Sequence, residues 1–147
     1  TNFTGGETYT FTITMESGVA TDGENQGGFF LSTTQGSLAS VDNTTQLTDG
    51  YMTHTAAGND QRSWNVSWTA PADDTRIADF TLYGNSVNGN GAPDTDGSDQ
   101  WNRATFAVPG ANAVAGPGEI SDSRKVLYLS LVVIGTLAAV VVGNRMV

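Results

Sequence analysis

The chain has 147 residues, enough for one domain with an appendage. It has no cysteine, which excludes disulfides, thiolate metal sites, c-type haem attachment and a cysteine nucleophile. All fifteen acidic residues but only three of the six basic residues lie in residues 1–123. The resulting negative charge of residues 1–123 excludes nucleic acid as a partner and favours a cationic soluble partner at low salt. An acidic surface can also serve simply to keep a domain soluble.

In chain order, seven segments alternate between apolar and polar residues or form short apolar runs, as strands do. In residues 28–33 the run of Phe29, Phe30 and Leu31 predicts a strand buried on both faces. Trp64 and Trp68 fall on one face of another strand and should supply much of the core. The predicted strands lie in residues 9–15, 28–33, 37–41, 51–55, 64–69, 78–82 and 104–108.

These strands predict an all-β fold, an antiparallel immunoglobulin-like β-sandwich over residues 1–108. Residues 109–123 are rich in glycine, proline and alanine without periodicity, which predicts a linker. Residues 124–147 are expected to form one C-terminal transmembrane helix with a short tail, because Val126 to Gly143 contains eighteen residues without a charge or proline. A helix buried in a soluble core is the alternative, but no other helix is predicted to surround it.

The predicted span carries small residues on one side. Gly135, Ala139 and Gly143 are four residues apart, so on a helix they share a face that would let another helix approach closely. We therefore expect this face to pack against other membrane protein subunits within the lipid bilayer.

The orientation of the span is argued from two conflicting indications. Arg124 and Lys125 precede the span and only Arg145 follows it, which places the N-terminal side in the cytoplasm. The chain begins with Thr1 instead of methionine, which predicts an exported domain whose signal peptide has been removed, although a trimmed chain would look the same. Since long domains are translocated largely regardless of flanking charge, we expect the domain outside the cytoplasm.

Three stretches between Tyr51 and Gly91 carry a family resemblance. They are Tyr51-Met-Thr-His-Thr-Ala-Ala-Gly58, Ser63-Trp-Asn-Val-Ser-Trp-Thr-Ala-Pro71, and Tyr83-Gly-Asn85 with Asn88-Gly-Asn-Gly91. This pattern resembles the choice-of-anchor V domain, which is related to the Reeler domain, over about Gly6 to Val108. The resemblance implies an extracytoplasmic β-sandwich on a variable C-terminal anchor. It implies no catalytic residue. No haem is expected either, because this chain lacks the Cys-x-x-Cys-His segments that can accompany the family.

Few residues offer a chemical site. His54 is the only histidine, and no nucleophile or further nitrogen ligand is arranged around it, so we expect a structural histidine. Asp94, Asp96 and Asp99 carry oxygens that suit calcium, but the same residues are typical of a hairpin loop, and the full EF-hand pattern is missing. A fainter candidate of the same kind is formed by Asp22 and Glu24.

Three triplets match the N-glycosylation acceptor pattern, at Asn2, Asn43 and Asn65. In a chain rich in asparagine and threonine such triplets also arise by chance. Asn65 is the least suitable acceptor, since it falls within a predicted strand.

These features predict a non-catalytic accessory subunit of a larger membrane complex, in which the helix packs against other subunits in the membrane and the sandwich stabilises the extracytoplasmic side. An energy-converting photosynthetic or respiratory complex is the first expectation. The choice of an energy-converting complex rests on the occurrence of the resembled family beside cytochrome-like segments, which is an analogy and not a physical argument. The alternative is a stand-alone, membrane-anchored surface module for adhesion or for binding a ligand or glycan, with calcium as its only candidate cofactor. An enzyme is not expected.

Overall fold

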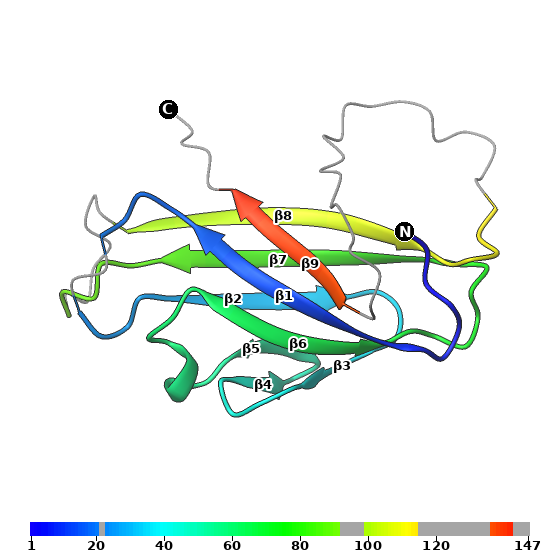
Figure 1. Cartoon of the computed structure of the whole chain (residues 1–147), viewed down its shortest axis with the longest axis horizontal. Coiled ribbons are helices and arrows are strands. Elements are labelled where there is room, and N and C mark those ends of the chain that lie inside the picture. Colours follow the sequence, from blue (N-terminus) through cyan, green and yellow to red (C-terminus); the bar gives the residue numbers. More distant parts are fainter. Residues whose placement is uncertain (21–22, 92–98, 115–135, 143–147) are drawn as a thin grey trace.

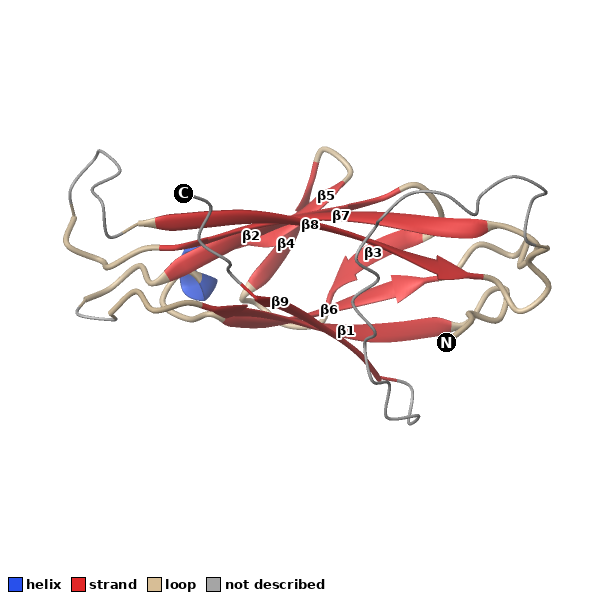
Figure 2. Cartoon of the chain, turned by 90° about the horizontal axis from the view of Figure 1, so that it is seen from above, coloured by secondary structure: helices blue, strands red, loops and turns tan. Residues whose placement is uncertain are grey.

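The computed structural model describes residues 1–20, 23–91, 99–114 and 136–142, which form an all-β sandwich of two sheets (Figures 1 and 2). The larger sheet has the strand order β4-β5-β2-β7-β8, and the smaller has β3-β6-β1-β9. The strands are β1 (Thr8–Glu16), β2 (Gly27–Thr33), β3 (Ser37–Ser40), β4 (Thr45–Thr48), β5 (Tyr51–His54), β6 (Ser63–Thr69), β7 (Ile77–Ser86), β8 (Gln100–Pro109) and β9 (Thr136–Val142), with a 3-10 turn at Ala56–Gly58.

The core lies between the two sheets and is dominated by aromatic rings. Trp64 and Trp68 of β6 are almost fully buried, as their spacing predicts. Their indole N–H groups donate to the carbonyls of Gly58, at 2.6 Å, and Gln35, at 2.8 Å, so neither polar atom is buried without a partner. From the larger sheet, the ring of Phe80 packs edge-on against Trp68 with centroids 5.2 Å apart.

All seven predicted strands are present, and the antiparallel sandwich is confirmed. Two differences concern the larger sheet. The short strand β4 was not predicted, because its sequence Thr-Gln-Leu-Thr has a single apolar residue. Strands β7 and β8 pair over ten residues, from Ile77 with Pro109 to Ser86 with Gln100, so the hairpin extends beyond the strands predicted at residues 78–82 and 104–108.

The burial predicted for β2 is wrong at one residue. Phe29 and Leu31 are buried in the core, but Phe30 is only half-buried and pairs with Tyr83, which is on the exposed face of β7. An uninterrupted apolar run therefore conceals a strand with two different faces, because successive side chains still alternate.

The N-terminal segment is tied to the end of β8. Phe3 is buried and forms an isolated parallel bridge with Gly110. The Phe3 amide donates to the Pro109 carbonyl at 2.9 Å, and the Ala111 amide donates to the Phe3 carbonyl at 2.8 Å. The first residues of the predicted linker 109–123 are thus bonded to the sandwich, and residues 115–123 lie outside the described part.

At the C-terminal end, β9 is a parallel neighbour of β1, with Thr10 opposite Thr136 and Glu16 opposite Val142. These seven residues belong to the stretch for which the sequence predicts a helix. Their β-branched valines suit an extended strand, and β1 offers a free sheet edge on the side away from β6. The rest of the predicted span lies outside the described residues, so the transmembrane helix stays a prediction. Among the residues that the structure describes, no helix has the length and apolarity to cross a membrane.

Candidate functional site

A row of aromatic side chains crosses the outer face of the larger sheet. Strand register sets Phe30 of β2 beside Tyr83 of β7, and Tyr83 beside Arg103 of β8. On the other side, Phe30 pairs with Thr53 of β5, and Tyr51 is two residues away on the same face. We call Tyr51, Phe30, Tyr83 and Arg103 the aromatic row. Its members come from four adjacent strands.

The side chains of the aromatic row contact one another in sequence. The rings of Tyr51 and Phe30 have centroids 4.4 Å apart and are inclined by 36°. Phe30 and Tyr83 follow at 6.1 Å in an edge-to-face arrangement of 73°. The guanidinium carbon of Arg103 lies 5.7 Å from the centre of the Tyr83 ring, within cation–π range. These contacts hold the row in place and leave part of each tyrosine uncovered.

The aromatic row is open to solvent, although its rings are large. Tyr51 is 42 % exposed and Tyr83 is 40 % exposed. Trp101 is 75 % exposed and stands two residues from Arg103, on the same side of β8. The one ion pair found among the described residues joins Arg76 to Asp73, so Arg103 is not paired with a described carboxylate. Its N–H groups are therefore available for a ligand.

The sequence contains the pattern that would have revealed the aromatic row. In β7, Phe80 and Leu82 alternate with Thr81 and Tyr83, so a core-facing Phe80 requires an outward Tyr83. The same rule separates Phe30 from Phe29. Sequence reasoning missed the row because it counted aromatic residues as core and did not follow both faces of each strand.

Comparison with known proteins adds no homologue: no protein-family model matches the chain, nor does any curated protein or solved structure. The resemblance to the choice-of-anchor V domain therefore stays a prediction.

His54 has structural contacts. Its Nδ1 lies 3.4 Å from the Phe29 amide, which donates to it, and 3.4 Å from the Thr53 hydroxyl. Its ring also lies 6.4 Å from the buried Trp64 ring. A Cβ on Gly28 would come within 2.4 Å of the imidazole Cε1, so glycine leaves the space that the ring occupies.

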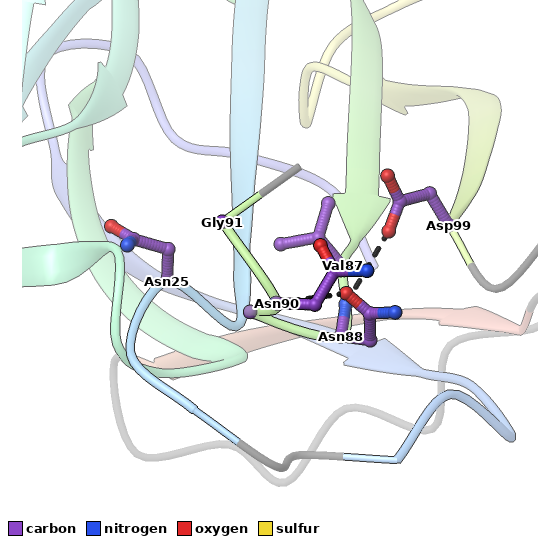
Figure 3. A pocket seen from close by; sticks show the side chains of 7 residues that line it. Asn25, Val87, Asn88, Asn90, Gly91 and Asp99 are labelled. Carbon is purple, nitrogen blue, oxygen red and sulfur yellow. Dashed lines mark hydrogen bonds between the residues drawn. The ribbon is translucent and has the colours of Figure 1, made fainter. Parts of the chain in front are cut away.

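Of the three aspartates proposed for calcium, the structure describes one. Asp99 accepts a hydrogen bond from the Asn88 amide at 3.4 Å, and Asp94 and Asp96 lie outside the described residues. Asp99 also lines a pocket of about 210 Å³ with backbone and amide groups (Figure 3). No group of three metal-ligating side chains occurs among the described residues. Calcium binding at this loop stays a prediction. The pocket is lined by Asn25, Val87, Asn88, Gly89, Asn90, Gly91 and Asp99.

The fainter acidic pair is described in part only, and the acceptor asparagines of the glycosylation triplets are exposed. Glu24 is exposed, and Asp22 lies outside the described residues. Asn2 and Asn43 are exposed on irregular segments. Asn65 lies within β6 and accepts a hydrogen bond from the Thr12 hydroxyl at 2.9 Å, which fits its low suitability as an acceptor.

The helix-packing face cannot be located in the same way. Gly135 and Gly143 lie outside the described residues, and Ala139 lies within β9. The small-residue face, and the accessory-subunit hypothesis that depends on it, remain predictions.

Proposed function

We propose that this chain is a non-catalytic surface module, an immunoglobulin-like sandwich anchored in a membrane by residues 124–147 and located outside the cytoplasm. The eighteen uncharged residues from Val126 to Gly143 support the anchor, because that length suffices to cross the hydrocarbon core as a helix. In the membrane-bound protein, residues 136–142 would leave the edge of β1 for the bilayer.

The aromatic row is the observation that carries the proposal. Soluble domains rarely leave several large rings uncovered side by side, and such patches mark binding surfaces. Here two tyrosines and Trp101 are exposed on one face next to Arg103, which has no ion pair with a described residue. Aromatic residues and arginine are also the residues that contribute most binding energy at protein surfaces. The module would therefore bind its partner through this face.

The accessory-subunit hypothesis places the main contact elsewhere, on the Gly135 face of the predicted helix. Both hypotheses share the membrane anchor and the exported sandwich. They differ in which surface holds the partner, so one pair of variants separates them.

The experiment compares Tyr83→Ala with Gly135→Leu in the full chain held in lipid nanodiscs, using retention of the nanodiscs on isolated cell envelopes stripped of the native protein, because the free chain would be held there by its own anchor. We expect Tyr83→Ala to reduce retention at least about tenfold, the loss of about 1.4 kcal/mol typical of a side chain important for binding. Gly135→Leu should be retained like the unsubstituted chain. Tyr83→Phe is the matched control, since it keeps the ring and removes only the hydroxyl.

The opposite result would reject the proposal. If Gly135→Leu no longer co-purifies with other subunits after extraction in mild detergent while Tyr83→Ala still does, and if nanodisc retention is insensitive to Tyr83→Ala, the partner binds the helix face. The accessory-subunit hypothesis would then replace the surface module.

A further inference from the structure

The shape of the aromatic row restricts its ligand to something long and thin. The row crosses from β5 to β8, three strand spacings or about 14 Å, and Trp101 extends it along β8. It lies on the outer face of a sheet, whereas the pocket described above lies at one end of the sandwich, around Asn88 and Asp99. An extended chain lying flat on the sheet fits such a surface.

The area of the exposed rings argues against a folded protein as partner. From their exposed fractions, Tyr51, Tyr83 and Trp101 together offer about 350 Å², taking 150–250 Å² for a whole aromatic side chain. A stable protein–protein interface needs about 800 Å² from each partner. The residues beside the row on the same face are polar, such as Thr53, Thr105 and Asn85, and not the aliphatic residues of an interface core.

The alternation of rings and polar groups matches the chemistry of a sugar. A pyranose ring presents an apolar C–H face, which stacks on an aromatic ring, and a rim of hydroxyls, which needs donors and acceptors. The row offers aromatic faces at Tyr51, Tyr83 and Trp101, with the N–H groups of Arg103 between the last two. Asn85, paired with Trp101 across the hairpin, adds an amide at that end.

Charge decides between neutral and acidic glycans. Residues 1–123 contain fifteen acidic residues against three arginines, so a polyanion approaching the domain is repelled. A neutral glycan is not opposed by this field, and Arg103 can donate to its hydroxyl and ring oxygens without a charge on the ligand.

We propose that the aromatic row with Trp101 binds a neutral oligosaccharide chain, whose sugar rings stack on Tyr51, Tyr83 and Trp101 while Arg103 donates hydrogen bonds to its oxygens. This inference rests on the proposed surface module and names its ligand class. Several stacked sugars are needed to span the row, so affinity increases with chain length.

The test uses the full chain in lipid nanodiscs, because maltoside and glucoside detergents present a neutral sugar themselves. The probes are gluco-, manno- and N-acetylglucosamine oligosaccharides of two to six units, with uronic acid oligomers as the anionic set. Binding is measured by calorimetry and by acrylamide quenching of tryptophan fluorescence. Trp64 and Trp68 are buried, so quenching reports mainly on Trp101.

We expect at least one neutral series to bind more tightly with increasing length and to protect Trp101 from the quencher. Tyr83→Ala and Trp101→Ala should each weaken binding at least about tenfold. Tyr83→Phe should bind nearly as the unsubstituted chain does. Thr14→Ala, on the outer face of the other sheet, should leave binding unchanged. Melting temperatures show that each variant is folded.

The inference is overturned if no neutral series binds, if only the uronic acid oligomers bind, or if binding is insensitive to Tyr83→Ala and Trp101→Ala. Envelopes oxidised with periodate distinguish this failure from that of the proposed function. Retention that depends on Tyr83 but survives periodate would point to a protein partner, and the surface module would stand without its glycan. Retention independent of Tyr83 would contradict both the proposed surface module and its binding of a glycan.

Discussion

The outer faces of the two sheets differ in how many of their side-chain groups already have a partner within the domain. On the smaller sheet, hydroxyl and amide groups of β1 and β6 bond to each other: Thr8 with Thr69 at 2.9 Å, Thr12 with Asn65 at 2.9 Å, and Thr14 with Ser63 at 3.2 Å. On the larger sheet, the aromatic row keeps ring surface and the Arg103 donors exposed. Polar groups that already bond to each other have little to gain from a ligand, whereas an exposed aromatic ring gains further contacts only when a ligand covers it.

The largest expected effect on stability follows from filling the space beside the aromatic row. Gly28 precedes Phe30 on the same face of β2, and a Cβ there would lie 2.4 Å from His54 Cε1 and 3.0 Å from Asn85 Oδ1. We expect Gly28→Ala to lower the free energy of unfolding by about 1–3 kcal/mol, because the imidazole must move from its hydrogen bond with the Phe29 amide. Urea unfolding measures the change.

Gly18→Ala is the matched control, since a Cβ there meets nothing within 4 Å. It should change stability by no more than about 0.5 kcal/mol. Equal effects of the two substitutions would contradict the close packing of Gly28 against His54 beside the aromatic row.

Much of the fold could be predicted from alternation alone, because Trp64, Val66 and Trp68 on one face of β6 require a core against them. The aromatic row was within reach of the same rule, as Tyr83 shows, but its arginine was not. Only the pairing of β7 with β8 brings Arg103 over Tyr83, twenty residues away in the sequence. For residues 136–142, valine suits both a membrane helix and a strand, and the alternation rule cannot choose between them.

A smaller effect is expected on the hydroxyl-bearing face of the smaller sheet. Thr12→Val keeps the β-branched shape but removes the hydroxyl that donates to Asn65 Oδ1, so unfolding should become easier by about 0.5–1 kcal/mol. Oligosaccharide binding should not change. Thr10→Val is the control on the same strand, because the Thr10 hydroxyl has no hydrogen bond to a described side chain. A loss of binding in Thr12→Val would show that both faces take part.

The smallest effect concerns two of the turns through which the chain passes from the smaller sheet to the larger. Between β3 and β4, the hydroxyl and amide of Thr44 donate to Asp42, at 2.5 and 2.8 Å, and lower its pKa. Between β6 and β7, the hydroxyl and amide of Thr75 donate to Asp73, at 2.5 and 3.1 Å, and lower its pKa, with a further contribution from Arg76. Both carboxylates are therefore stabilised in the charged form when the domain is folded.

A pKa below the unfolded value adds stability that is complete above the ordinary aspartate pKa, about 3.9, and is lost as the pH falls through the lower folded value. We expect Thr44→Val combined with Thr75→Val to lower the melting temperature slightly at pH 6 and by a smaller amount at pH 2, because the carboxyls take up protons as the pH falls through their lowered folded pKa. Thr48→Val on β4 is the control, expected to change the melting temperature equally at both pH values.

Because one core joins the sheets, Trp64 and Trp68 of the smaller sheet and Tyr83 of the larger should report the same acid transition. Separate transitions would mean that the two faces belong to independently unfolding layers, and the contrast between them would then extend to stability.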